Sequence, residues 1–196
     1  MSTTIDASYT QRLQTKSGAR WKRVLNVQAP YLWNVRRLCG GRTLDVGCGI
    51  GRNLAALSSD SVGIDHNPTS VDVAREAGLN AMTTVEWQRS PLRRAASFDA
   101  VLVAHVIEHL PSGQAETLLA DYIAALRPGG RVVMICPQER GYASDPTHVA
   151  WTTGDDLVDL ARAVGLTPEP WRSFPAPRSV GRVFTYNEFT VVAHKI

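Results

Sequence analysis

Three glycines at alternate positions follow an aspartate in the segment Leu44–Asn53 of this 196-residue chain. The four residues are Asp45, Gly47, Gly49 and Gly51. They come at the end of an apolar run, and glycines there let the main chain turn tightly and approach a ligand without Cβ atoms in the way. We expect a helix to follow, whose first N–H groups would face that ligand. The segment therefore predicts a site for a cofactor that carries oxygen acceptors.

The spacing of these glycines does not match two other phosphate-binding patterns. A dinucleotide fingerprint needs Gly-x-Gly-x-x-Gly, but Arg52 takes the place of the third glycine after Gly47 and Gly49. In the other frame, Leu54 takes that place after Gly49 and Gly51. No Gly-Lys-Ser/Thr run ends the segment, so a nucleoside-triphosphate loop is disfavoured as well.

Histidines and carboxylates follow two later strands. His105 and His109 flank Glu108 after one apolar run, and His148 follows the next, three residues after Asp145. The carboxyl ends of parallel strands meet at the edge of a sheet where ligands bind, and histidine is a natural general base near neutral pH. We expect His148 to be the catalytic base, oriented by Asp145, with His109 and Glu108 as further catalytic candidates. A turn-capping role for His148 and a helix-end role for His109 fit the sequence equally well.

Short β-rich runs alternate with helical patterns along the chain, which predicts an α/β fold with helices on both faces of the sheet. Strands are expected at 42–47, 61–65, 80–86, 98–104 and 130–135, with two more near 166–173 and 185–194. Helices are expected at about 67–77, 112–126 and 153–164.

The chain divides by pattern into a lid and a domain. Residues 42–196 predict a single compact domain, and residues 1–41 an N-terminal helical lid segment. Within the lid, residues 19–38 are amphipathic, and Pro30 is expected to interrupt that helical pattern.

An aspartate two residues before the first glycine is characteristic of another family. Asp45, Gly47, Gly49 and Gly51 match every fixed position of Asp/Glu-x-Gly-x-Gly-x-Gly, and here the chain resembles the class I S-adenosylmethionine-dependent methyltransferases of the type 11-like, small-molecule group. The resemblance continues in order over residues 42–165. It implies S-adenosylmethionine as cofactor and a Rossmann-like, doubly wound sheet of about seven strands, mostly parallel with an antiparallel last strand.

The resemblance also implies a set of cofactor contacts. Asp65, at the end of the second strand, is expected to accept the ribose hydroxyls. Glu86 would accept from the adenine amino group, and Trp87 would form an aromatic wall, although burial in the core explains Trp87 equally well. The complete expected set of cofactor-binding residues is Asp45, Gly47, Cys48, Gly49, Gly51, Asp65, His66, Glu86, Trp87 and His105.

The implied activity is methyl transfer to a small-molecule acceptor, on oxygen or nitrogen. Arg172, Arg178 and Arg182 suggest an anionic or a lipid- or glycan-linked acceptor, although solvated surface arginines explain them as well. Two alternatives stay open: an RNA or protein methyltransferase, and a catalytically inactive S-adenosylmethionine-binding protein. The acceptor atom and the oligomeric state are not specified by the sequence.

Composition narrows the class of protein further. No apolar run is long enough for a membrane span, and the first 20 residues lack a signal-peptide pattern, so we expect a cytoplasmic protein. The three cysteines, Cys39, Cys48 and Cys136, form no paired motif, which argues against disulfides and a zinc site; no metal site is expected. A net charge of +3 without a basic run does not favour a nucleic-acid partner.

Overall fold

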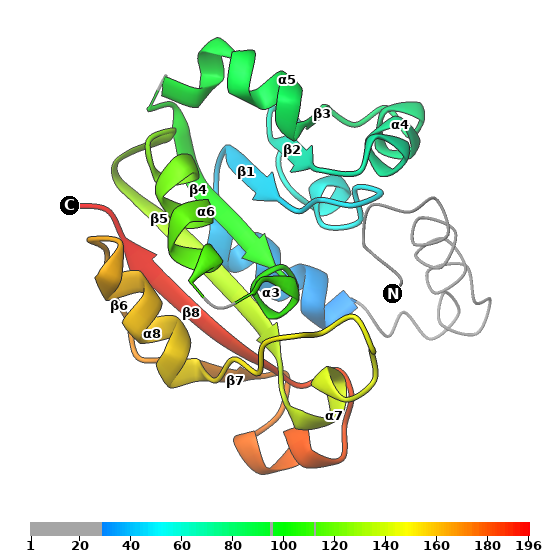
Figure 1. The fold of residues 1–196 in the computed structure, drawn as a ribbon, viewed down its shortest axis with the longest axis vertical. Helices are drawn as coiled ribbons and strands as arrows, with labels where there is room; N and C mark the ends of the chain where they lie inside the picture. Colours follow the sequence, from blue (N-terminus) through cyan, green and yellow to red (C-terminus); the bar gives the residue numbers. More distant parts are fainter. Residues whose placement is uncertain (1–28, 95, 112) are drawn as a thin grey trace.

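The computed structural model of the protein describes residues 29–94, 96–111 and 113–196. An eight-stranded sheet with the order β3-β2-β1-β4-β5-β8-β6 forms its centre, and β7 pairs with β8 (Figure 1). All pairings among the first five strands are parallel, whereas β8 is antiparallel to its neighbours. The strands are β1 (Thr43–Val46), β2 (Val62–Asp65), β3 (Ala81–Thr83), β4 (Phe98–Ala104), β5 (Leu126–Pro137), β6 (Thr167–Pro168), β7 (Arg172–Phe174) and β8 (Glu188–His194).

Helices flank this sheet. The α-helices are α3 (Ala29–Cys39), α4 (Pro68–Glu76), α5 (Thr84–Arg89), α6 (Gln114–Ile123), α7 (Glu139–Tyr142) and α8 (Gly154–Ala163). The 3-10 helices are η1 (Leu54–Ala56), η2 (Pro91–Arg94), η3 (Ile107–His109) and η4 (Arg178–Arg182). None of the helices in the described part of the chain combines the length and apolarity that a membrane span requires.

Alternation along the strands gives the sheet two buried faces. In β4, Val101 and Val103 belong to a cluster with residues of α5, α6 and α8, whereas Ala100 and Leu102 belong to a second cluster with α3. Helices therefore cover both faces, and Figure 1 shows α6 and α8 in front of the strands. The expected Rossmann-like α/β architecture is confirmed.

Three local expectations are wrong. The strand near 166–173 is two short strands, β6 and β7, so the sheet has eight strands instead of about seven. The glycine turn leads into the three-residue 3-10 helix η1 instead of an α-helix. Strand β3 ends at Thr83 instead of running to residue 86, because the Thr83 side chain accepts a hydrogen bond from the N–H of Glu86 and caps α5.

Most of the expected N-terminal lid segment, residues 1–28, lies outside the described residues. The part that is described, α3, contains Pro30 within its first turn, where a missing N–H group costs no helical hydrogen bond. Pro30 therefore fits the start of α3, and the rest of the expected amphipathic segment, residues 19–28, lies outside the described residues. Val35, Leu38 and Cys39 of α3 are buried against β4 and β5, so these residues belong to a helical layer on the sheet.

Gly63 in β2 provides a test of how tightly the glycine turn packs on the sheet. A Cβ atom at position 63 would lie 2.7 Å from the Cys48 Sγ atom and 2.7 Å from a methyl carbon of Leu54. We expect Gly63→Ala to lower the free energy of unfolding by about 1–3 kcal/mol, because the core has no room for the methyl group. Urea denaturation would measure this loss.

The double variant Cys48→Ala/Gly63→Ala is the matched control, because removing Sγ opens space beside the new methyl group. We expect it to be more stable than the sum of the two single losses predicts. Strict additivity would show that the Cys48 contact is not the cause.

Candidate functional site

The glycine turn is fastened to the neighbouring strand by main-chain hydrogen bonds. The N–H groups of Gly47 and Cys48 donate to the Ile64 carbonyl at 2.8 and 3.0 Å. The N–H of Gly49 donates to Asp65 Oδ2 at 2.8 Å. Gly47 has φ +74°, and an added Cβ there would collide with Val106, so glycine is required at this position. The turn therefore lies as an open loop over the carboxyl ends of β1 and β2.

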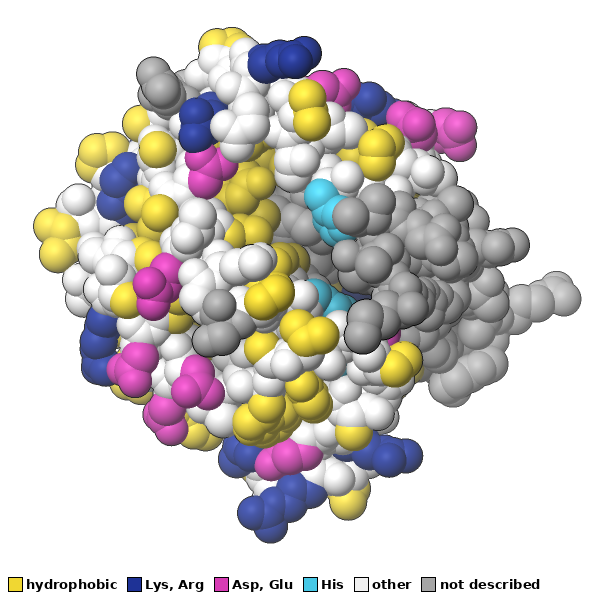
Figure 2. Space-filling model, viewed as in Figure 1, with side chains coloured by type: hydrophobic (Ala, Val, Ile, Leu, Met, Phe, Trp, Pro, Cys, Tyr) yellow, Lys and Arg dark blue, Asp and Glu magenta, His cyan; other side chains and the backbone are white. Residues whose placement is uncertain are grey.

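A cavity of about 440 Å³ opens beside this turn. Its volume is within the range of small-molecule sites. On the face seen in Figure 2, histidine side chains lie near the centre, with hydrophobic side chains around them. The lining comes from the ends of β1, β2 and β4 and from α6, and comprises Val46, Gly47, Cys48, Gly49, Ile50, Arg52, Asn53, Ile64, Asp65, His66, Thr84, Ala104, His105, Val106, His109, Leu110, Pro111, Gln114, Leu118 and Tyr122.

Two of the expected cofactor residues, Asp45 and Gly51, lie beneath the turn and outside this lining. Asp45 is 1% exposed, and its Oδ2 atom has no hydrogen-bond partner among the described residues. Burial, with the nearby Asp65 carboxylate, raises the pKa of Asp45 to about 7. Gly51 has φ +84°, and a Cβ there would collide with Leu79, so this glycine allows the turn to pack on its neighbours.

The structure places neither Glu86 nor Trp87, the two residues expected at the adenine, in the cavity lining, and Trp87 follows the alternative of burial in the core. Glu86 is the third residue of α5; it accepts hydrogen bonds from the Thr83 N–H and from Arg75, at 2.7 and 2.8 Å. Trp87 is fully buried between Phe98 and Tyr122. Because α5 starts early, Glu86 points outward and Trp87 points into the core.

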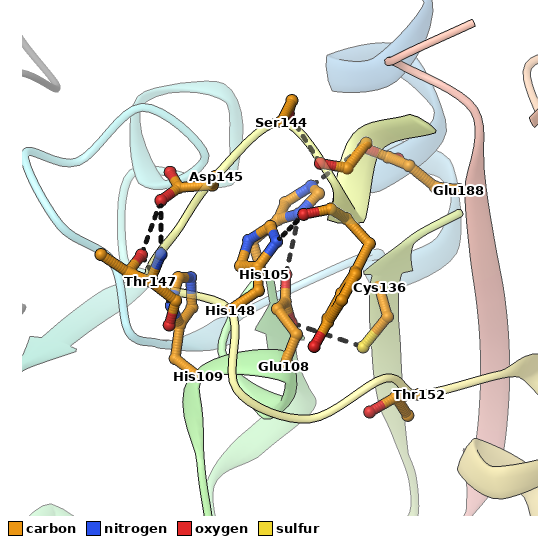
Figure 3. A network of polar contacts seen from close by, with 12 residues as sticks. His105, Glu108, His109, Cys136, Ser144, Asp145, Thr147, His148, Thr152 and Glu188 are labelled. Atoms are coloured by element: carbon orange, nitrogen blue, oxygen red, sulfur yellow. Dashed lines mark hydrogen bonds and ion pairs between the residues drawn. The ribbon is translucent and has the colours of Figure 1, made fainter. Parts of the chain in front are cut away.

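His105 forms a charged network at the end of β4 (Figure 3). Its Nε2 atom lies 2.9 Å from Glu188 Oε1, and its Nδ1 atom lies 3.3 Å from Glu108 Oε1. Burial opposes the charge, but the Glu188 and Glu108 carboxylates raise the pKa of His105 to about 10. The backbone of His105 has φ +59°, a strained conformation that directs the side chain toward the cavity. His105 is therefore a fixed imidazolium in the cavity wall.

His109 and His148 meet although 39 positions separate them, and their ring centroids lie 4.7 Å apart. The loop after α7 is fastened to η3, because the N–H groups of Val149 and Ala150 both donate to the Glu108 carbonyl, at 2.9 and 3.1 Å. His109 lines the cavity, whereas His148 lies behind it. Burial lowers the pKa of His109, so its ring is neutral at neutral pH.

The expected support of His148 by Asp145 takes a different form. Asp145 Oδ1 accepts from the N–H and the hydroxyl of Thr147, at 3.1 and 2.7 Å. The Thr147 carbonyl in turn lies 3.2 Å from Nδ1 of His109. The Nδ1 atom of His148 lies 2.7 Å from the carbonyl of Tyr142. Asp145 therefore supports His109 through Thr147, and Tyr142 orients His148.

Sequence reasoning missed several residues of the site. Arg52 and Asn53 line the cavity directly after the glycine turn, and their position next to the turn could have predicted this. Glu188 reaches His105 only because β8 pairs with β5, which no local pattern reveals. Two of the arginines proposed to attract an anionic acceptor are ion-paired outside the cavity, Arg172 with Glu169 and Arg178 with Glu139.

Comparison with known proteins finds a family model and curated relatives that match part of this chain. A family model described as a methyltransferase domain matches residues 44–134. Ubiquinone biosynthesis O-methyltransferase of Xanthomonas oryzae pv. oryzae is 34% identical over 105 residues, 50% of this chain and 43% of that protein. The enzyme of the same name from Methylocella silvestris is 28% identical over 161 residues, 75% of this chain and 57% of that protein. The chain spans about half the length of these curated relatives.

Solved structures share the fold. A methyltransferase dependent on S-adenosylmethionine from Archaeoglobus fulgidus aligns with a TM-score of 0.70 at 20% identity, over 97% of this chain and 100% of that one. A possible histamine N-methyltransferase from Thermotoga maritima aligns with a TM-score of 0.70 at 17% identity, over 96% and 99%. The fold is thus that of a Rossmann-like methyltransferase. The family match over residues 44–134 and this shared fold support a class I S-adenosylmethionine-dependent methyltransferase, with S-adenosylmethionine as the cofactor that such a domain uses.

The raised pKa of Asp45 predicts a pH dependence of stability. In the unfolded chain this carboxyl ionises near its ordinary pKa of 3.8, whereas in the folded chain it keeps its proton up to about pH 7. Stability is therefore lost as pH rises between these values. We expect the free energy of unfolding of Asp45→Asn to rise, relative to that of the parent protein, by about 2–3 kcal/mol as the pH increases from 5 to 7.

Urea denaturation across this pH range would measure the gain. Asp72→Asn, which changes an exposed carboxylate on α4, should run parallel to the parent protein. A difference between Asp45→Asn and the parent that stays constant with pH would contradict the expected ionisation.

Proposed function

We propose that this protein transfers a methyl group from S-adenosylmethionine to an oxygen atom of a small molecule. One observation carries the proposal: the glycine turn and the histidine cluster open on the same cavity, since Gly49 and His109 both line it. A cofactor on the turn and an acceptor at the histidines would therefore meet with little water between them. Methyl transfer from an activated donor requires mainly this alignment and exclusion of water.

The residues at the turn fit the cofactor. S-adenosylmethionine supplies the methyl group already activated on a positively charged sulfonium. We propose that Asp65 holds the ribose hydroxyls, because its carboxylate lines the cavity at the end of β2. Gly47, Cys48 and Gly49 expose main chain to the same space, and His66 follows directly after Asp65.

The opposite wall supports an oxygen acceptor. A hydroxyl is a weak nucleophile until it loses its proton, and Glu108, His109 and His148 form a polar cluster that can assist this loss. His109 is the member that reaches the cavity. The relatives from Xanthomonas and Methylocella are named O-methyltransferases, which supports the same atom type. Leu110, Leu118 and Tyr122 form an apolar part of the lining, so the acceptor should carry an apolar portion.

Asp65→Asn tests the cofactor end. The substitution keeps the shape of the side chain but removes its charge, so hydrogen bonds to the ribose should weaken. We expect affinity for S-adenosylmethionine to fall by about 10–100-fold, measured by calorimetry. Asp72→Asn is the matched control. Because Asp65 also accepts from Gly49 and Asn67, a thermal melt must accompany the measurement. Unchanged affinity would remove the ribose assignment.

His109→Ala tests the acceptor end. Radiolabelled methyl transfer to a cell extract, separated into metabolites, lipids, RNA and protein, should place the label in small hydroxylated molecules. We expect the variant to lower this transfer by about 100-fold or more while calorimetric affinity for S-adenosylmethionine is kept. His194→Ala, at the far end of β8, should retain the parent rate. Label found in RNA or protein would contradict the proposed acceptor class.

A further inference from the structure

Three groups that ligate metals well converge beside the cavity. Glu108 and His109 come from η3, and His148 comes from the loop after α7. Their ligand atoms all lie within 4.8 Å of one another. Figure 3 shows the three side chains close together between β4 and that loop. Hydrogen bonds from the loop to the Glu108 carbonyl keep the two segments in this position.

The hydrogen bonds of both rings define which nitrogen is available. A carbonyl oxygen only accepts, so the Nδ1 atoms of His109 and His148 must donate, to Thr147 and Tyr142 respectively. In a neutral imidazole this leaves Nε2 with a free lone pair. Anchoring of Nδ1 on a backbone carbonyl is the arrangement that orients histidine ligands in metal sites.

Glu108 provides a second, independent observation. The residue is fully buried, and its carboxylate has only long contacts: Oε1 lies 3.3 Å from Nδ1 of His105, and Oε2 accepts from the Cys136 thiol at 3.5 Å. The other nitrogen of the His105 ring, Nε2, lies 2.9 Å from Glu188 Oε1, so two buried carboxylates contact one imidazole.

We propose that Glu108, His109 and His148 bind a divalent first-row transition metal ion, with Zn²⁺ as the favoured ion. Two imidazoles and one carboxylate are a donor set of catalytic zinc sites, whereas Mg²⁺ prefers oxygen ligands. Zn–N bonds are about 2.0–2.1 Å long, so modest side-chain rotations would bring the three groups onto one ion. Three protein ligands leave at least one coordination position open.

The open position gives the ion a role, and that role rests on the proposed function. His109 lines the cavity, so an ion on His109 would be reached by an acceptor oxygen. A metal ion lowers the pKa of a bound hydroxyl and orients it. The three side chains would then act on the acceptor through the ion.

Ion binding can be measured on the full chain without an acceptor. Metal-free protein would be titrated with CoCl₂, whose visible absorption reports nitrogen ligation, and then with ZnCl₂ and MgCl₂. We expect one equivalent of Co²⁺ to bind, Zn²⁺ to displace it and Mg²⁺ to leave it in place. His148→Ala should weaken Co²⁺ binding by about 100-fold or more, and Glu108→Gln should also weaken it.

His194→Ala is the matched control, since His194 lies at the opposite end of β8 and pairs with Glu169. It should bind Co²⁺ as the parent protein does. Circular dichroism separates lost ligation from lost folding, and His148→Gln provides a second variant if His148→Ala unfolds. Absence of the Co²⁺ band, displacement by Mg²⁺, or equal binding by folded His148 variants and the parent would overturn the proposal.

The two proposals fail in different ways. Co²⁺ binding by a protein that methylates no hydroxyl acceptor would support the ion site and remove the proposed function. Methyl transfer by protein that binds no Co²⁺ or Zn²⁺ would support the function and overturn the ion site.

Discussion

The rest of the site depends on two hydrogen bonds that the carboxylate of Asp65 accepts. Its Oδ2 atom accepts from the N–H of Gly49 in the turn, and its Oδ1 atom accepts from the N–H of Asn67, both at 2.8 Å. Asn67 in turn caps α4 by accepting from Thr69 and Ser70. One side chain thus ties the glycine turn to the start of the next helix. Because hydrogen bonds to a charged acceptor are stronger than neutral ones, the turn has a defined shape without a following α-helix.

The sequence contained enough information for the architecture. The burial of β4 and β5 on both faces follows directly from their apolar residues, and a Thr153–Asp156 capping box starts α8 where a helix is expected. The errors came where local chemistry competes with pattern. The segment 80–86 reads as a strand by composition, but Thr83 and Glu86 form a capping box that starts a helix two residues after Met82. That box overrides β propensity, which depends strongly on context.

In the site, too, local features could be predicted and long-range contacts could not. The glycine turn and Asp65, each at the end of an apolar run, could be predicted from their spacing. Contacts made by long-range pairing could not: Glu188 reaches His105 from an antiparallel strand, and His148 reaches His109 because two backbone N–H groups bind the Glu108 carbonyl. The absence of paired cysteines, on which no metal site was expected, carries no information about the set Glu108, His109 and His148. Two histidines and a glutamate from separate segments have no fixed spacing to detect.

Near each end of the cavity lies one buried carboxylate, and both are subject to the same electrostatic constraint. Asp45 beneath the turn and Glu108 behind His109 each keep an oxygen without a hydrogen-bond partner in the described part of the chain. An unpaired buried charge is unfavourable by several kcal/mol, so a stable fold needs something to offset it. At Asp45 a proton does so, which is why its pKa rises to about 7. At Glu108 the ion pair with His105, a ring that also contacts Glu188, does so. The two buried carboxylates therefore meet the same electrostatic constraint with different groups, a proton at Asp45 and a shared imidazole at Glu108.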